Sequence, residues 1–337
     1  MKKIFNLIAS FVLLAGFSAC NKDGSDKPGL PPAPVPTVNY KGLTFISSGK
    51  STVCLAKVGA PDEITLEYST DESQWNPYTI GEKISMADGS FLLFRAGEQK
   101  NLTFSKGSDS YYHFEISGPV TAQGNIMSLL DRDFSTPLST NAFFALFEGC
   151  TSLLSAPELP ATTMEQGCYF RMFAECTGLK SAPELPAKEL AYNCYGWMFK
   201  GCSALTYVPD LPATEMVSYC YNNMFANCTS LKFAPELPAT RLDMGCYHCM
   251  FEGCTSLTSA PELPATELVS NCYEFMYKDC RNLRYVIGLF TTEPSEKTTK
   301  DWLSGVAASG TFIKSKKATW DVTGAHGIPE GWKIETW

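Results

Sequence analysis

Cysteines recur in the second half of this chain at a fixed interval of 26 residues. One set runs from Cys150 to Cys280, and a second set runs from Cys168 to Cys272. Each cysteine of the first set except Cys280 is followed by the sequence Pro-Glu-Leu-Pro, or in one case Pro-Asp-Leu-Pro. A repeat of this length indicates a solenoid, because each coil can bury its apolar side only against neighbouring coils.

Within one coil, Leu190, Cys194, Met198 and Cys202 fall four residues apart, which predicts one face of a helical segment. The Pro-Glu-Leu-Pro segment must be extended, because proline fixes φ and disfavours helix in the residue before it. Prolines also limit strand pairing, so any parallel strands should be short. We expect them near Leu153, Leu179, Leu205, Leu231 and Leu257.

The rest of the chain divides around this array, and the sequence predicts a mixed α/β protein. Residues 40–118 alternate apolar and polar positions between turn signals, which is typical of a β-sandwich-like domain. Residues 119–290 form the predicted leucine-rich-repeat-type solenoid. Residues 291–337 break the period and read as the C-terminal cap that a solenoid needs.

The first 39 residues predict export and anchoring. Lys2 and Lys3 precede an apolar run that ends in Phe17-Ser18-Ala19-Cys20, so residues 1–19 read as a signal peptide. The ending resembles the lipobox of bacterial lipoproteins, which implies cleavage before Cys20 and lipidation of that residue. Residues 20–39 are rich in proline and glycine, as expected of a tether. The resemblance implies a lipid-anchored protein of the outer membrane, exposed at the cell surface.

The repeat itself also resembles a known family. The phrase Cys-Tyr-x-x-Met-Phe-x-Gly-Cys-Thr-Ser-Leu, followed by an extended segment with leucine, is similar to the 26-residue surface repeat of bacterial leucine-rich-repeat lipoproteins, as found in gut anaerobes. The similarity covers residues 142–289. It implies a surface-displayed solenoid, although Pro-Glu-Leu-Pro stands where relatives often have a β-rich segment.

The repeated cysteines could bind metal ions or form disulfides, but their spacing favours neither role. Cys246-Tyr-His248-Cys249 offers the single short pairing, but Cys249 occupies a position that varies between repeats and is expected to face outward, and zinc needs four convergent ligands. Cys168 and Cys176 are too far apart along a helix to be bridged. Ala142 occupies a cysteine position of the first coil, so we expect free, buried thiols, while disulfides between neighbouring coils stay open.

Charge and motifs exclude several function classes. The net charge of −8 and the absence of a basic run argue against nucleic acid as a partner. The three histidines lie in no nucleophile, zinc or phosphate-loop motif, and no cofactor, metal or catalytic residue is predicted. The acidic repeat position is interpreted as a solvated face. It contains Glu158, Glu184, Asp210, Glu236 and Glu262.

One variable repeat position predicts where a ligand would bind. It lies beside an inward-facing residue and should face outward on an extended backbone. The predicted ligand-binding residues are Tyr207, Phe233 and Tyr285 in this position, with Lys180 and Lys232 in the preceding one. Surface scatter, or packing of Tyr285 against the cap, would also explain the pattern.

These observations predict a non-catalytic surface protein that binds a protein or glycan of a host or of the environment. The alternative is a structural spacer or docking subunit of an outer-membrane assembly. A glycoside hydrolase that uses two carboxylates is a remote alternative. Apart from the membrane reached through the lipid on Cys20, the sequence names no partner.

Overall fold

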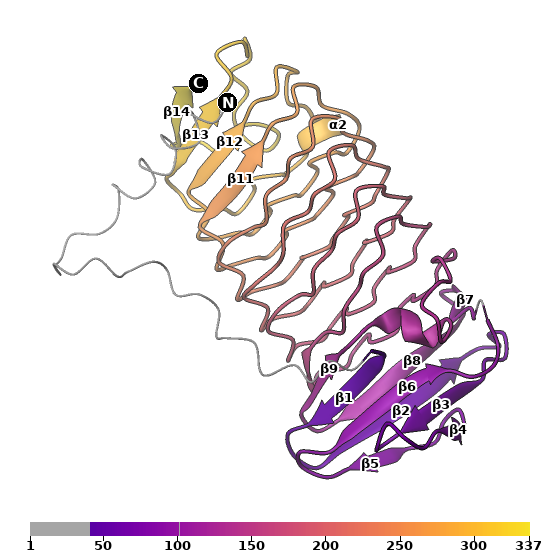
Figure 1. Ribbon diagram of the computed structural model, residues 1–337. Helices are drawn as coiled ribbons and strands as arrows, with labels where there is room; N and C mark the ends of the chain where they lie inside the picture. The colour runs from indigo at the N-terminus through magenta and orange to yellow at the C-terminus, as the bar shows by residue number, and fades with distance from the viewer. Residues whose placement is uncertain (1–40, 101) are drawn as a thin grey trace, which may run out of the picture. The chain divides into compact units, whose positions relative to one another are not determined.

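The computed structural model describes residues 41–100 and 102–337, so the predicted signal peptide, Cys20 and the tether lie outside the described residues. A β-sheet-rich module comes first, as predicted (Figure 1). One of its sheets has the strand order β10-β9-β1-β6-β3-β4, in which β10 (Leu153–Ser155) comes from the solenoid, and the other has the order β5-β2-β8-β7. The strands of the module are β1 (Leu43–Ser47), β2 (Ser51–Val58), β3 (Leu66–Ser69), β4 (Asn76–Tyr78), β5 (Ile84–Met86), β6 (Phe91–Ala96), β7 (Ser105–Gly107), β8 (Ser110–Ser117) and β9 (Val120–Gln123).

Aromatic side chains hold the two sheets of this module together. Phe45 on β1 and Phe94 on β6 both meet Phe114 on β8 of the other sheet, with ring centroids 5.0 and 5.6 Å apart. All three side chains are fully buried. Alternating apolar residues along each strand therefore fill the space between the sheets, as the sequence pattern indicates.

The module continues into the solenoid without a break in its core. Strand β10 (Leu153–Ser155), in the first coil, pairs in parallel with β9. The ring of Phe147 stacks on Phe114, with centroids 5.1 Å apart. The first coil therefore packs against the module as each later coil packs against the coil before it.

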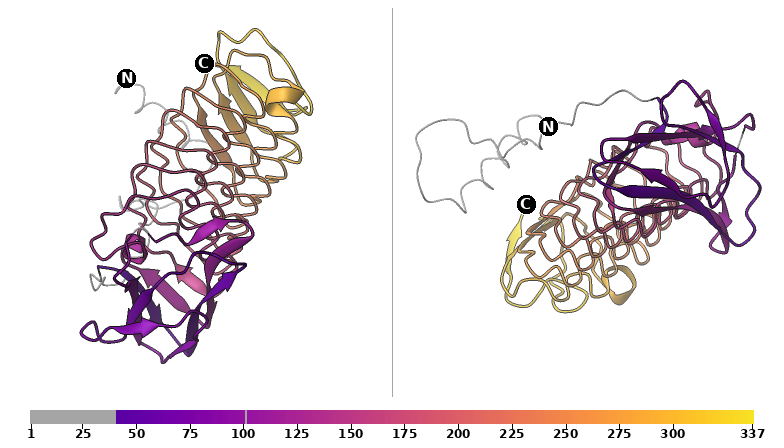
Figure 2. Two further views of the ribbon diagram at one scale, coloured as in Figure 1. Left: turned by 90° about the vertical axis from the view of Figure 1, so that its right-hand side faces the viewer. Right: turned by 90° about the horizontal axis from the view of Figure 1, so that it is seen from below.

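One side of each coil is a run of linked turns, which we call the turn ribbon. It spans residues 141–150, 167–176, 193–202, 219–228, 245–254 and 271–280 (Figures 1 and 2). Every second amide donates to a carbonyl of the next coil. In the ribbon 193–202, the N–H groups of Tyr195, Trp197 and Phe199 do so at 2.9–3.0 Å. The amides between them, such as that of Met198, bond three residues back within the same coil.

The turn ribbon corrects the helix prediction. Every fourth residue in it has a positive φ, between 53° and 76° in these segments, which no α-helix contains. Each ribbon segment has three such positions. The first and the third are mostly glycine, asparagine or aspartate, the residues that adopt this conformation most readily. The position near the end of the ribbon contains Gly149, Glu175, Gly201, Asn227, Gly253 and Asp279. In the described residues, helix is confined to the 3-10 segment η1 (Ile126–Leu129) and to α2 (Glu296–Thr299), so the mixed α/β prediction is wrong.

The inward side chains of the turn ribbon form two stacked columns of rings. The first column runs through Phe143, Tyr169, Tyr195, Tyr221, Tyr247 and Tyr273, with adjacent centroids 5.8–6.0 Å apart. The second column runs through Phe147, Phe173, Phe199, Phe225, Phe251 and Tyr277, at 5.3–5.7 Å. Repetition every 26 residues stacks like rings nearly parallel to one another, and each such pair adds about 0.5–1.5 kcal/mol to the burial of its area.

The opposite side of each coil contains the prolines and makes few backbone hydrogen bonds. We call the segments 155–161, 181–187, 207–213, 233–239 and 259–265 the proline side. Between its first coils the pairing is reduced to isolated bridges such as Ser181 with Tyr207. A regular parallel sheet, in the order β11-β12-β13-β14, occurs only at the C-terminal end. Its strands are β11 (Ser259–Leu263), β12 (Tyr285–Gly288), β13 (Thr311–Lys314) and β14 (Lys333–Thr336).

The last coils are closed by tryptophans instead of repeat residues. The ring of Trp302 stacks near Tyr273, at a centroid distance of 6.1 Å, and its Nε1 donates to the Gly327 carbonyl at 2.8 Å. The Nε1 of Trp332 donates to the Ala307 carbonyl at 2.8 Å. Residues 291–337 therefore extend the ring column and cover it. Among the described residues, no helix has the length and apolar character of a membrane span.

Candidate binding surface on the solenoid

Tyr207 and Phe233 occupy the same repeat position on adjacent coils and both point into solvent. Tyr207 is 46% exposed and Phe233 is 70% exposed. Leu205 and Leu231, two residues before Tyr207 and Phe233, are fully buried. The side chains therefore change from inward to outward between each leucine and the aromatic residue that follows it, as predicted. We call Tyr207 and Phe233 the exposed aromatic pair. Rigid aromatic side chains of this kind often anchor recognition surfaces.

Lys180 and Lys232 are also exposed, each one residue before this repeat position. Neither side chain forms an ion pair with any residue in the described part of the chain. Their ammonium groups are therefore available to an acceptor outside the protein. The surface around the aromatic pair offers two cations and two rings.

Tyr285 lies apart from the other predicted residues. Ser259 intervenes in the same repeat position, and Tyr285 itself begins β12, paired with Ser259 on one side and Thr311 on the other. Its side chain is half-buried, and burial, with the charge of Glu335, raises the pKa of its hydroxyl. The structure thus divides the predicted stripe into an exposed pair and a tyrosine that packs within the C-terminal sheet.

The acidic repeat position follows three residues later on each coil. Its side chains are exposed on the first four coils, at Glu158, Glu184, Asp210 and Glu236. Glu262 is half-buried in β11, and both burial and the nearby Glu236 raise its pKa. No group of three or more histidine, cysteine, aspartate or glutamate residues in the described ranges is placed to hold a metal ion.

A second exposed apolar cluster lies at a variable repeat position that the sequence-based prediction does not include. Tyr192 is 47% exposed and Met244 is 42% exposed, in one repeat position two coils apart. The ring of Tyr219 lies between them, 6.0 Å from Tyr192, and covers the Cα of Gly245. Aligning the repeats would have shown this position as variable, since it reads Gln166, Tyr192, Ser218, Met244 and Ser270.

The cysteines provide packing and hydrogen bonding rather than chemistry. All cysteines in the described residues are free and buried, as predicted. Each thiol from Cys176 to Cys280 in the first set donates to a phenylalanine carbonyl of the preceding coil, at 3.0–3.2 Å. Burial raises the pKa of the thiols, to about 12 for Cys254, so they stay protonated and weakly nucleophilic.

His248 and Cys249 come closest to a catalytic arrangement, but their geometry does not make one. The same ring nitrogen, Nε2 of His248, lies 3.6 Å from a Glu274 carboxylate oxygen and 3.8 Å from the Cys249 sulfur. A base that activates a thiol needs one nitrogen for the thiol and the other for the orienting carboxylate. Cys249 is buried rather than at an outer position, and burial raises the pKa of its thiol.

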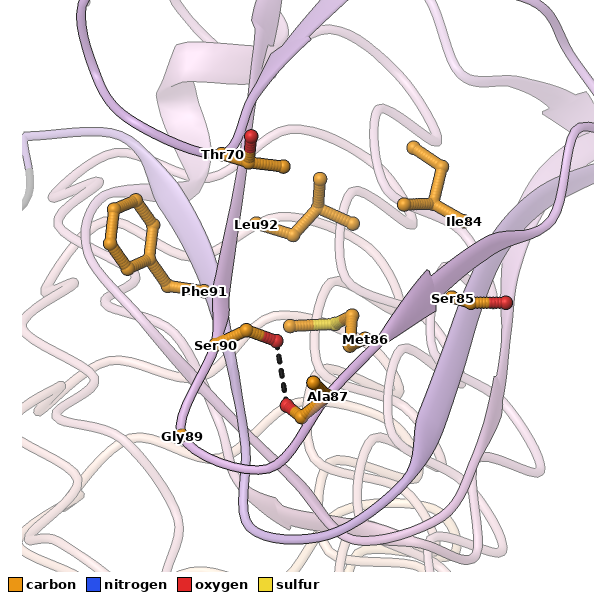
Figure 3. Close-up of a pocket in the computed structure, with 9 residues that line it drawn as sticks. All are labelled: Thr70, Ile84, Ser85, Met86, Ala87, Gly89, Ser90, Phe91 and Leu92. Atoms are coloured by element: carbon orange, nitrogen blue, oxygen red, sulfur yellow. Dashed lines mark hydrogen bonds between the residues drawn. The ribbon is translucent and has the colours of Figure 1, made fainter.

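A hollow of about 250 Å³ opens between β5 and β6 in the N-terminal module (Figure 3). Ile84, Met86 and Leu92 point into it, and the Ser90 hydroxyl donates to the Ala87 carbonyl at 2.7 Å. None of its lining residues carries a titratable side chain. The hollow can accept a small apolar group but supplies no acid or base.

Comparisons of this chain with protein-family models, with curated proteins and with solved structures found no match.

Proposed function

We propose that this chain is a surface-anchored, non-catalytic binding protein whose solenoid recognises a protein or glycan. The proposal rests mainly on the exposed aromatic pair, Tyr207 and Phe233. Nearly all the other large rings of the solenoid are packed inside it or lie half-buried on its surface. Exposing two of them on adjacent coils has no packing benefit, whereas such rings gain much from contact with a partner.

The two free lysines support the same surface. A tyrosine, a phenylalanine and two ammonium groups on neighbouring coils can combine ring stacking with hydrogen bonds to carbonyl, carboxylate or sugar oxygens. The partner that fits is a macromolecule, since the pair lies on an open surface. The N-terminal sequence adds the setting: lipid on Cys20 and a proline-rich tether would hold the domain outside the outer membrane.

The partner can be sought with the full chain carrying Cys20→Ser, which removes the lipidated residue. Screening this form against glycan and extracellular-matrix arrays should yield a ligand that the Tyr207→Ala/Phe233→Ala variant binds at least about tenfold more weakly, as loss of hot-spot residues does. Tyr192→Ala, a tyrosine of equal exposure at another position of the coil, is the matched control. Unchanged binding by a folded double variant would remove this surface from the proposal.

The anchor has its own test. In the native host, the unmodified chain should fractionate with membranes and the Cys20→Ser chain should be soluble, because the acyl chains supply the membrane affinity. A Cys20→Ser chain that stays with the membranes at unchanged gel mobility would contradict the lipoprotein assignment. It would leave the binding surface untouched.

A further inference from the structure

Strand β14 (Lys333–Thr336) is the outermost strand of the C-terminal sheet (Figure 1). It pairs in parallel with β13 on one side, with Phe312 opposite Ile334. The N–H of Lys333 donates to the carbonyl of Gly310, the residue before β13, and the N–H of Trp337 donates to the carbonyl of Lys314 at the end of β13, both at 2.9 Å. Since successive residues of a strand direct their backbone groups to opposite edges, those of Ile334 and Thr336 face away from β13. No other strand of the described residues pairs with this edge.

The side chains of β14 are unusual for a protected edge. Ile334 is 40% exposed and Trp337 is 42% exposed, which places two of the few exposed large apolar side chains on this short segment. Lys333 and Glu335, two residues apart and so on the same face, are joined by an ion pair at 2.6 Å. The edge therefore combines free backbone donors and acceptors, an apolar side chain and one charge of each sign.

We propose that β14 pairs antiparallel with β14 of a second copy of this chain, centred on Ile334. Ile334 would then face Ile334 of the second copy, and each would donate its N–H to the carbonyl of the other. In this register Lys333 lies opposite Glu335 of the second copy, and Glu335 lies opposite its Lys333. Both cross-strand pairs join opposite charges, which is the favourable arrangement on an antiparallel ladder.

The register is fixed by the backbone. An antiparallel pair of β14 strands centred on Lys333 or Glu335 could not form its central hydrogen bonds, because the backbone groups of those residues already face β13. Centring it on Glu335 would also place like charges opposite each other. A shift by one residue thus loses the hydrogen bonds and the charge complementarity together. The two four-stranded sheets would join into one continuous sheet across the contact.

Charges at a sheet edge can also serve to prevent pairing. Such protective charges act because any incoming strand would bury them at a cost in free energy. Reversing the sign of a protective charge therefore leaves the protection unchanged. The proposed contact instead depends on which charge lies at 333 and which at 335. Charge reversal therefore distinguishes a docking edge from a guarded one.

The experiment is sedimentation velocity on the full chain with Cys20→Ser in every variant, between about 1 and 100 µM, a range that resolves micromolar association. The reference chain should dimerise. Lys333→Glu alone and Glu335→Lys alone should each weaken dimerisation at least about tenfold, because like charges then lie opposite each other at both cross-strand positions. An equimolar mixture of the two single variants should dimerise again as a heterodimer, and the double reversal in one chain should restore the homodimer.

Ile334→Pro is the backbone control, since it removes the N–H that the second copy needs without removing a bond to β13. It should be monomeric with an unchanged circular dichroism spectrum. A reference chain that is monomeric throughout this range would overturn the proposal. So would a dimer that tolerates both single reversals, or single variants that fail to associate when mixed.

Discussion

The two long sides of each coil are held to their neighbours by different means. On the turn ribbon, every second amide bonds to the next coil, and stacked rings fill the space beneath. On the proline side, Leu185 and Leu211 are as deeply buried as the rings, yet their amides have no hydrogen-bond partner among the described residues. One side is therefore hydrogen-bonded and packed, and the other is held mainly by packing, with isolated bridges such as Ser181 with Tyr207.

The C-terminal coils show how this side of the coil changes where the prolines are absent. On the same side of the coil, Tyr285–Gly288 and Thr311–Lys314 contain no proline and form a regular parallel sheet. Proline has no N–H to donate and holds φ near −65°, so two prolines in four residues prevent a continuous ladder. The turn ribbon therefore supplies most of the backbone hydrogen bonds between the early coils.

Amide hydrogen exchange is the strongest test of this difference. The amides of Tyr195, Trp197 and Phe199 should exchange at least about 10³-fold more slowly than those of Leu185 and Leu211, because the former open only with the coil. Mass spectrometry of peptides from 193–202, for the ribbon, and from 181–187 and 207–213, for the proline side, measures the two rates.

Strand β12 is the internal control for that experiment. Val286 and Ile287 lie on the same side of the coil as the prolines but within a paired strand. They should be protected like the ribbon. Equal exchange on both sides of the early coils would show that the proline side is held by contacts beyond those described.

The left-handed positions of the ribbon give a second, smaller test. Gly253 has φ +72°, and an added Cβ would lie 2.3 Å from the side-chain oxygen of Asn227. Gly253→Ala should lower the free energy of unfolding by about 1–2 kcal/mol. Glu175→Gly, at the same repeat position with φ +60°, should be neutral or stabilising.

A control on the proline side completes that test. Ala239→Gly, at a buried residue with no positive φ, should show the ordinary cost of glycine, about 0.5–1 kcal/mol. Chemical denaturation monitored by circular dichroism measures all three. A destabilising Glu175→Gly as large as Ala239→Gly would contradict the backbone assignment of the ribbon.

The two cysteine sets should differ by the smallest amount. Cys202 donates to the Phe173 carbonyl of the preceding coil at 3.1 Å, whereas the thiol of Cys194 has hydrogen bonds within its own coil but none to a neighbouring coil among the described residues. Cys202→Ala should therefore be more destabilising than Cys194→Ala by about 0.5–1.5 kcal/mol, the net contribution of one hydrogen bond. Equal unfolding free energies for the two variants would reduce the thiol contact to simple packing.

Much of the architecture could be predicted, and one element could not. The period, the extended proline segment, the cap and the buried free thiols all follow from the repeat. The prediction of a helix at 190–202 is wrong. Leu190, Cys194, Met198 and Cys202 are spaced by four residues, which is close to the 3.6 residues per turn of an α-helix and so imitates a helical face. A signal for the true structure was present in Gly149, Gly201 and Gly253, which recur where the backbone turns left-handed.

The candidate surface was predicted in part for a similar reason. Comparing the repeats with one another identified Tyr207 and Phe233 as variable and outward-facing, and both are exposed. The same comparison could not separate Tyr285 from them, because its burial depends on β13, a strand outside the repeat. It also did not indicate that β14 would leave one edge unpaired.

The sequence by itself determined that this chain is a solenoid with a 26-residue coil, because identical apolar residues at a fixed interval can be buried together only by stacking. Tertiary structure alone decided how each coil is held. Whether an amide bonds within its own coil or to the next depends on backbone angles that several sequences share. Those angles are selected by contact with the neighbouring coil, which supplies the carbonyl for every second amide and the ring against which each aromatic side chain packs.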